Sequence, residues 1–230
     1  MSGESFPTQP TVAPRRNRRL LWALLAVLVL TFVAVVGVSR FAARRDAQAS
    51  RTAIVLAGTS PSKMGSLVAN PRPPTDFTLT DADGRPFALS ALRGKPTLLF
   101  FGFTQCPDLC PTTLDEFKGA KRALGADADR LQVVFISVDP EHDTNATIKS
   151  YLATFDPSFI GLRGDDATLK RVANNYEFSY QKVPLPDGGY TFEHTATSFL
   201  IDAQGQLRVI YPYGVPANAL AQDARTFFAP

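Results

Sequence analysis

The sequence PTLLFFGFTQCPDLCPTTL, residues 96–114, contains the clearest indication of the fold. Its first part, residues 96–102, is a continuous apolar run of the kind found in strands that are buried on both faces. Its last part leads into a helix predicted over 111–124, where a proline suits the first turn because that turn leaves its N–H groups unbonded. Between them lie Cys106 and Cys110, the only cysteines of the chain. The cysteines are therefore expected where a strand ends and a helix begins.

Strands and helices alternate through the rest of the C-terminal part. A β-hairpin precedes the quoted stretch, over 77–80 and 86–89, with the turn signal DADG between its strands. The other predicted elements are, in order, a strand over 131–138, helices over 144–155 and 165–174, a loop or hairpin tip over 183–190, strands over 197–201 and 207–211, and a last helix over 217–228. Such alternation predicts an α/β fold, with a central sheet flanked by helices on both faces.

An apolar segment near the N-terminus, residues 20–38, runs 19 residues without a charge. At a rise of about 1.5 Å per residue, a helix of this length matches the roughly 30 Å hydrocarbon core of a bilayer, which predicts one transmembrane anchor. The alternative is a cleaved signal peptide, for which AQA at residues 47–49 has the form of a cleavage site, but its apolar part would be longer than the usual 7–15 residues or so. The predicted organisation is a cytoplasmic tail (1–19), the anchor (20–38), a linker rich in Ala, Ser, Gly and Pro (39–72) and a folded domain (73–230).

Charge separates the two parts of the chain. Residues 1–51 carry eight Arg and two acidic residues, a net +6, so the formal +3 of the whole chain leaves −3 for residues 52–230. Arginines that precede the anchor favour a cytoplasmic N-terminus, although the arginines that follow it weaken this preference. A mildly acidic domain is not expected to bind nucleic acid.

The two cysteines allow three interpretations: a structural disulfide, a redox couple or two ligands of a metal. Their i, i+4 spacing permits a disulfide, because Cα atoms about 6 Å apart suit one. A position near a helix N-terminus favours the thiolate, which is both the nucleophile and the metal ligand. Pro107 and Pro111 bias the cysteines before them away from regular helix. An exported domain meets oxidising conditions, so the pair closes to a disulfide unless something reduces it or binds it as metal ligands.

The scarcity of histidine and methionine limits the metal sites that the chain can form. It contains two histidines, His142 and His194, and one methionine after the initiator, Met64. A four-ligand zinc site made of Cys and His needs both histidines, whereas two thiolates and one imidazole match a three-coordinate site suited to Cu(I). His194 precedes the strand 197–201 and is expected to face the cysteine loop if the two strands are neighbours. His142 lies in a charged turn, where an exposed side chain is the simpler interpretation.

Asp139 directly follows the buried strand predicted at residues 131–138. If this strand runs parallel to the one at 96–102, the carboxyl ends of both meet at one edge of the sheet, where open α/β sheets place their sites. A turn former before Pro140 is an equally good interpretation of the same aspartate.

Three separated motifs resemble the Sco/SenC family, membrane-anchored copper chaperones for cytochrome c oxidase that have a thioredoxin-like fold. The first motif is FGFTQCPDLCPTTL at residues 101–114, which contains the CPxxCP pattern of the family. The second is ISVDPEHDT at residues 136–144, and the third is a single histidine, His194, ahead of a strand that ends FLID at 199–202. The resemblance covers about residues 70–228.

The resemblance implies a copper site formed by Cys106, Cys110 and His194, with Asp139 close to it. The bound metal is expected as Cu(I), with Cu(II) left open, and the expected recipient is the copper-centre subunit of cytochrome c oxidase. A thioredoxin-like reductase and a copper donor are further expected partners. Delivery by ligand exchange has no chemical turnover, so a chaperone is expected rather than an enzyme. In a bacterium the anchor would lie in the inner membrane, with the C-terminal domain in the periplasm or outside the cell.

An alternative function within the same resemblance is that of a thiol–disulfide oxidoreductase. Such a protein would keep the copper-ligating cysteines of the oxidase reduced, with its own two cysteines as the redox pair and no role for His194. Two features depart from the usual family pattern: Glu193 and Thr195 flank His194 where Asp and Ser are more common, and His142 stands where an Arg is common.

Overall fold

The structure is a computed structural model that describes residues 56–71, 76–186 and 188–228, together with Trp22, Leu25 and Leu28. The chain divides into two compact units, residues 1–51 and 52–230. In the first unit the three described residues are helical and exposed. Within the described parts of the chain, no helix is both long and apolar enough to span a bilayer. Apart from these three residues, the predicted tail and anchor lie outside the described residues.

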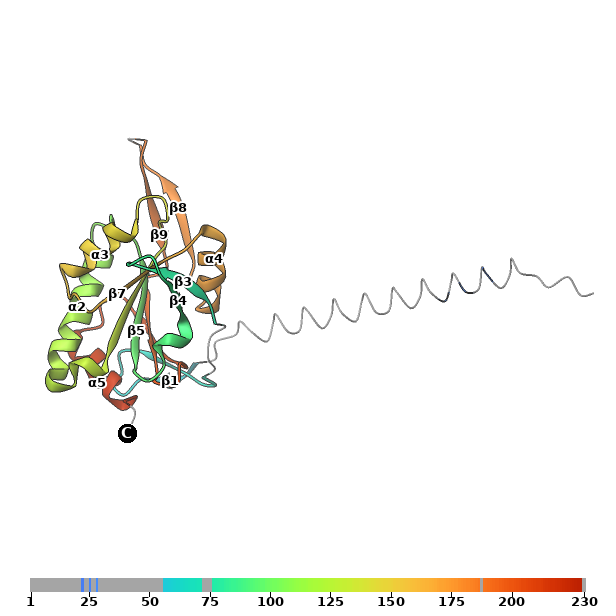
Figure 1. Ribbon diagram of the computed structural model, residues 1–230. Coiled ribbons are helices and arrows are strands. Elements are labelled where there is room, and N and C mark those ends of the chain that lie inside the picture. Colours follow the sequence, from blue (N-terminus) through green and yellow to red (C-terminus); the bar gives the residue numbers. More distant parts are fainter. Residues whose placement is uncertain are drawn as a thin grey trace, which may run out of the picture. The chain divides into compact units, whose positions relative to one another are not determined.

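A nine-stranded mixed sheet forms the centre of the second unit (Figure 1). Its strand order is β1-β2-β11-β10-β5-β6-β7-β3-β4. The pairs β5–β6 and β6–β7 are parallel and the remaining neighbours are antiparallel. The strands are β1 Leu56–Thr59, β2 Ser66–Val68, β3 Thr78–Asp81, β4 Pro86–Ala88, β5 Thr97–Gly102, β6 Gln132–Ser137, β7 Ile160–Arg163, β10 Thr197–Ile201 and β11 Leu207–Pro212. The predicted mixed sheet with an N-terminal hairpin, β3–β4, is confirmed.

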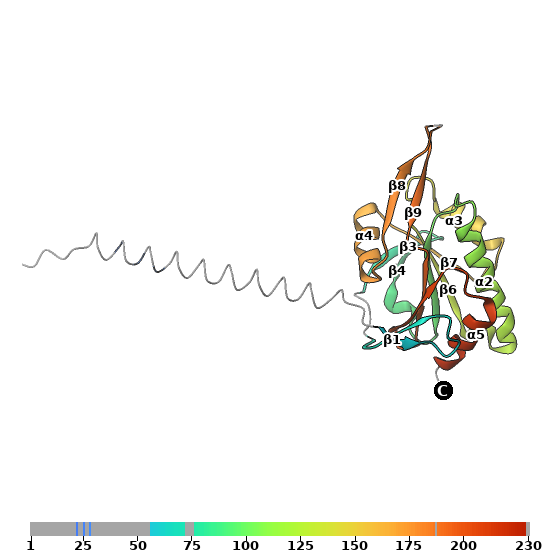
Figure 2. The same ribbon diagram turned by 180° about the vertical axis from the view of Figure 1, so that it is seen from behind.

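Helices cover both faces of the sheet. They are α2 Leu109–Leu124, α3 Asn145–Ala153, α4 Asp166–Asn175 and α5 Ala217–Thr226, and short 3₁₀ turns span Leu89–Leu92 and Gly125–Arg130. The two opposite views place α2, α3 and α5 on one flank and α4 on the other (Figures 1 and 2). Thr144 and Asp165 begin α3 and α4 as N-caps, because each side chain accepts a hydrogen bond from a backbone N–H in the first turn.

Alternate side chains of β5 fill the core on the two faces of the sheet. Every residue of β5 is buried, as its continuous apolar run predicts. On one face Phe100 packs edge-on against Phe117 of α2, with ring centroids 6.5 Å apart. On the other face Phe101 stacks on Phe178 at 4.6 Å and meets Tyr176, just after α4, at 5.6 Å. The strand that leads to the cysteines is thus the most enclosed part of the sheet.

The predicted linker, residues 39–72, is too long. Residues 56–68 contain β1 and β2, and β2 joins the main sheet by pairing with β11. The turn between them is held by buried Asp223 of α5, which accepts hydrogen bonds from the Ser62 backbone N–H at 2.7 Å and from its hydroxyl at 2.8 Å. The partners of these strands are distant in sequence, so the local composition gave no sign of them.

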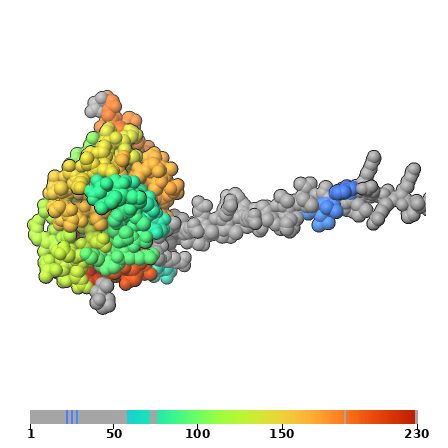
Figure 3. All heavy atoms as spheres, viewed as in Figure 1, coloured from blue at the N-terminus to red at the C-terminus, as the bar shows by residue number. Residues whose placement is uncertain are grey.

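A separate two-stranded sheet stands apart from the main one. It consists of β8 Tyr180–Pro184 and β9 Tyr190–His194, which pair antiparallel. This hairpin projects from the end of the domain where β5 and β6 terminate (Figures 1 and 3). The prediction of a loop or hairpin tip over 183–190 agrees with it. The described part of the sheet also includes β7, which the sequence analysis missed because only four residues form it.

Candidate metal centre

The cysteines lie in the turn from β5 to α2. The Cys106 backbone N–H donates to the Phe103 carbonyl at 3.2 Å, which closes the turn. Cys110 is already in the first turn of α2, and its N–H donates to the Cys106 sulfur at 3.4 Å. The expected bias of Cys110 away from regular helix does not prevail, since Cys110 is helical. Pro111 itself fits the first turn, because its missing N–H has no helical partner to lose there.

The two sulfurs differ in their access to solvent. Both cysteines are free, Cys110 is fully buried and Cys106 is partly buried. Cys110 fits against β5 because Gly102 has no side chain: a Cβ there would stand 2.7 Å from the Cys110 sulfur. Cys106 is therefore the sulfur that an incoming ligand or thiol reaches first.

His194 is the last residue of β9 and points its imidazole toward the cysteine loop. Its Nδ1 lies 3.1 Å from the Thr195 carbonyl and serves as the donor to it, which leaves Nε2 as the unprotonated nitrogen. Nε2 is buried and has no hydrogen-bond partner among the described residues. Phe100, Phe103 and Phe178 surround the ring, with centroids 6.2, 6.3 and 5.6 Å away. A buried acceptor without a partner is costly unless something binds it.

The three residues converge although 84 positions separate Cys110 from His194. Strand β10 pairs antiparallel with β5, which places Ser198 opposite Phe100 and so returns the chain beside the cysteine turn. One ligand atom from each of Cys106, Cys110 and His194 lies within 4.8 Å of the others. Within the described parts of the chain, no other cluster of three Cys, His, Asp or Glu residues has this geometry.

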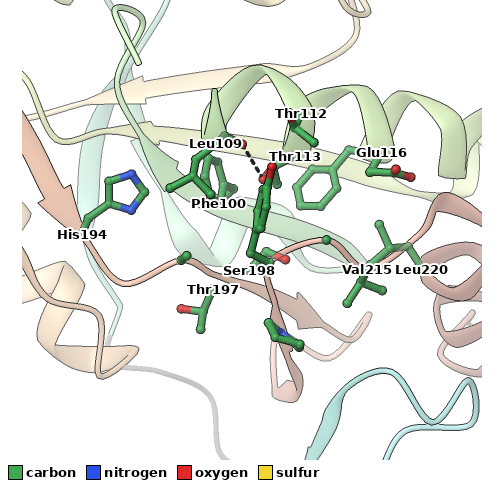
Figure 4. Close-up of a pocket in the computed structure, with 15 residues that line it drawn as sticks. Phe100, Leu109, Thr112, Thr113, Glu116, His194, Thr197, Ser198, Val215 and Leu220 are labelled. Atoms are coloured by element: carbon green, nitrogen blue, oxygen red, sulfur yellow. Dashed lines mark hydrogen bonds between the residues drawn. The ribbon is translucent and has the colours of Figure 1, made fainter. Parts of the chain in front are cut away.

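A small apolar pocket adjoins the imidazole between α2 and the start of β10. Figure 4 shows His194 at one end of it and Glu116 with Leu220 at the other. Phe100 and Leu109 separate the two ends. The imidazole of His194 therefore borders an apolar surface rather than open water on this side.

The electrostatics of the pair favour one thiolate and one thiol. The hydrogen bond from the Cys110 thiol, together with those from the backbone N–H groups of Cys110 and Asp108, lowers the pKa of Cys106 to about 4 against the opposing effect of burial. The same hydrogen bond, together with burial and the Cys106 charge, raises the pKa of Cys110. At neutral pH the pair carries a single negative charge, on the more accessible sulfur.

This difference predicts selective alkylation of Cys106. A thiol of ordinary pKa, about 8.5, reacts roughly tenfold more slowly for each pH unit below that value. Since the pKa of Cys106 is about 4, its iodoacetamide reaction rate is expected to change less than about threefold between pH 5 and 8. Peptide mass spectrometry of the reduced protein should find the label on Cys106 and not on Cys110. A rate that rises steadily to pH 8 would contradict the assignment.

Asp139 does not join the cluster. It is buried at the end of β6, which runs parallel to β5 as expected, but its carboxylate faces the turn that follows. Oδ1 accepts from the Tyr190 hydroxyl at 2.8 Å, and Oδ2 lies 2.9 Å from Nδ1 of His142. His142 is partly exposed, as expected, and its ring stacks on Tyr190 with centroids 4.8 Å apart.

Asp143, which was not among the predicted site residues, holds the cysteine turn. This fully buried carboxylate accepts hydrogen bonds from the Thr104 backbone N–H at 3.1 Å and from the Thr104 hydroxyl at 2.6 Å. It also accepts one from the Ser137 hydroxyl at the end of β6. Burial raises the pKa of Asp143, although these hydrogen bonds partly offset the effect. The second motif contains Asp143, so the signal was present, but nothing local distinguishes it from the acidic residues before it.

Two soft sulfur ligands and one imidazole with a free nitrogen suit a three-coordinate Cu(I) ion. A closed structural zinc site normally takes four protein ligands, and the cluster of described residues supplies three. The donor set thus fits copper better than structural zinc.

The comparison with family models decides the family. A model described as SCO1/SenC matches residues 69–229. The chain belongs to the SCO1/SenC family. A SCO2-like protein of Rickettsia felis is 38% identical over 133 residues, which are 57% of this chain and 65% of the relative. The chain thus spans slightly less than two thirds of that relative's length.

Solved structures of Sco proteins share the fold. ScoI of Bradyrhizobium japonicum with copper bound is 44% identical with a TM-score of 0.63, and the match covers 68% of this chain and 99% of that one. ScoI of Arabidopsis thaliana with copper bound is 32% identical with a TM-score of 0.62, covering 66% and 94% of the two chains. The thioredoxin-like fold predicted from the resemblance is confirmed, and copper is the metal that these homologous structures hold.

Proposed function

We propose that this Sco-family protein is a membrane-anchored copper chaperone that binds copper through Cys106, Cys110 and His194 and delivers it to the copper centre of cytochrome c oxidase during assembly. The observation that carries the proposal is the buried Nε2 of His194, which has no hydrogen-bond partner among the described residues and lies beside one thiolate and one thiol. Copper in the homologous ScoI structures supports the choice of metal. We further propose that the domain lies in the periplasm or outside a bacterial cell, held to the inner membrane by residues 20–38.

The differing access of the ligands suggests an order of events. Cu(I) first meets the Cys106 thiolate, and the Cys110 thiol then loses its proton as its sulfur binds the metal. Nε2 of His194 completes the site without a proton change, since it is already free. For delivery, a thiolate of the recipient approaches from the side of the more exposed Cys106, and Cys110 regains a proton as it leaves copper. A reductase and a copper donor are the proposed partners that keep the pair reduced and supply the metal.

Replacing His194 by Ala is expected to weaken Cu(I) binding about a hundredfold, because one ligand of a protein metal site corresponds to roughly 3 kcal/mol. Competition with a Cu(I) chelator, using the reduced full-length chain, measures the affinity. Glu193→Ala is the matched control, since Glu193 is the exposed neighbour of His194 on the same strand, and its affinity should stay at the wild-type value. Equal affinities of the His194→Ala variant and the wild type would refute the proposed site.

Thiol–disulfide exchange is the second candidate function, and the low pKa of Cys106 favours it. A thiolate on the accessible sulfur with a second thiol beside it is the arrangement that attacks and then resolves a mixed disulfide. The two functions separate at His194, which exchange does not need. If His194→Ala keeps both exchange activity and copper loading of the oxidase in cells, the oxidoreductase is the better description.

A further inference from the structure

The hairpin that carries His194 is a two-stranded sheet outside the main one. It has five residue pairs, from Tyr180 opposite His194 to Pro184 opposite Tyr190. A hairpin of two strands is marginally stable in water on its own. Contacts with the body of the domain must therefore fix its position, and with it the position of the histidine.

Asp139, His142 and Tyr190 form such a contact, which we call the latch. The Tyr190 hydroxyl donates to Oδ1 of Asp139 at 2.8 Å, and this carboxylate is almost fully buried. Oδ2 of Asp139 meets Nδ1 of His142 at 2.9 Å, and the His142 ring stacks on the Tyr190 ring at an interplanar angle of 23°. The carboxylate therefore orients the two rings that stack on each other.

A second contact reinforces the latch from the other strand of the hairpin. Lys182 of β8 places its Nζ 3.6 Å from the Tyr190 ring centroid and 2.7 Å from Oε1 of Glu141. Both strands of the hairpin thus reach the turn at residues 139–142. Lys182 and Glu141 are exposed, so this ion pair contributes less than the buried carboxylate does.

The turn that bears the latch is rigidly joined to the cysteine loop. Strands β5 and β6 pair in parallel along their full length, and the Val138 N–H donates to the Gly102 carbonyl at 2.8 Å. Asp143, four residues after Asp139, holds Thr104 in the cysteine turn. Cys106, Cys110 and Asp139 therefore belong to one rigid part of the domain. His194, in contrast, is the last residue of the hairpin, which the latch holds against that part.

We propose that Tyr190 is a positioning residue: its hydrogen bond to Asp139 holds the hairpin so that His194 faces the two sulfurs, and opening this bond lets the imidazole withdraw from the metal. Copper left on two thiolates is more readily passed on, so the latch sets how long the chaperone retains its metal. The inference rests on the proposed function and adds a control of release to it. The contacts of the His194 ring with three phenylalanine rings still favour the position that faces the sulfurs. Opening the latch therefore makes withdrawal more frequent, and retention is weakened rather than lost.

The test compares two Tyr→Phe variants of the full-length chain. Tyr190→Phe keeps the ring and removes the hydroxyl that binds Asp139. It is expected to raise the rate of Cu(I) loss to a chelator about tenfold, because losing one hydrogen bond to a charged group changes an equilibrium constant by about this factor. X-ray absorption of the Cu(I)-loaded variant should show a weaker imidazole contribution. The matched control is Tyr180→Phe, because Tyr180 lies opposite His194 and its buried hydroxyl has no partner among the described residues; it should behave as the wild type.

Hydrogen exchange of the metal-free protein tests the latch separately from copper binding. Amides of residues 180–194 should exchange about tenfold faster in Tyr190→Phe than in the wild type, while those of β5 and β6 stay protected. Should Tyr190→Phe fail to fold, His142→Ala removes the stacked ring instead and is expected to speed the same amides. Unchanged copper loss and unchanged hairpin exchange would overturn the latch. If the wild type itself binds no copper at the triad, the proposed function fails, and the exchange experiment still decides whether the latch holds the hairpin.

Discussion

A Gly102→Ala variant is expected to bind copper at least about tenfold more weakly than the wild type. Its free energy of unfolding is expected to fall by about 2 kcal/mol, the usual cost of an added methyl group in a filled core. The new Cβ would stand 2.7 Å from the Cys110 sulfur, 2.9 Å from Phe100 and 3.0 Å from Phe135. All three groups are buried, and the Cys110 sulfur is the nearest of them, so it has to move furthest. Displacing it changes the distance between the two sulfurs that we propose as copper ligands.

Gly161→Ala separates the effect on the site from the effect on the fold. Its Cβ would collide with Ile148 and approach Leu152 to 2.8 Å, both on α3 and away from the cysteine turn. This variant should lose stability by a similar or larger amount in urea unfolding, yet keep the wild-type Cu(I) affinity. If both variants lost copper affinity equally, general loosening of the fold would explain the result, and the proposed role of Gly102 would be wrong.

Local patterns were sufficient to predict the centre of the fold. The continuous apolar runs at residues 96–102 and 131–138 are typical of strands that are buried on both faces of a sheet, and both form central strands. The short strands β1, β2 and β7 escaped prediction because three or four residues carry no periodicity that distinguishes them from loop. What makes them strands is pairing with distant segments and, for β1 and β2, the carboxylate of Asp223 on the last helix. The equally short β3 and β4 were predicted because the turn DADG joins them.

The parts of the candidate site that depend on spacing in the sequence could be predicted. The parts that depend on which side chains are buried together could not. The two cysteines follow from their position between a strand and a helix. His194 depends on β10 lying beside β5, which the sequence alone left as a condition. Among the acidic residues that follow β6, Asp139 is the one that the family resemblance implied near the metal. The structure instead directs Asp139 to the hairpin and Asp143 to the cysteine turn, a choice that only the three-dimensional contacts reveal.

Asp143→Ala is therefore expected to have the largest effect on stability, a loss of about 3 kcal/mol or more. The substitution leaves three donors without their acceptor: the backbone N–H and hydroxyl of Thr104, and the hydroxyl of Ser137. Each unsatisfied buried group costs about 1–3 kcal/mol, although a water entering the vacated space recovers part of this. Urea unfolding of the metal-free protein, followed by circular dichroism, measures the loss.

Asp143→Asn distinguishes the charge from the shape of this side chain. Because burial raises the folded-state pKa of Asp143, the native state binds more protons than the unfolded chain between the two pKa values. The favourable contribution of this titration is fully present below the unfolded pKa, about 4, and is lost as the pH rises through the folded value. The stability difference between the wild type and Asp143→Asn should accordingly be largest in acid and shrink toward neutral pH. A difference that grew with pH would mean that the three hydrogen bonds, rather than burial, determine the pKa of Asp143. The charged carboxylate would then hold the cysteine turn.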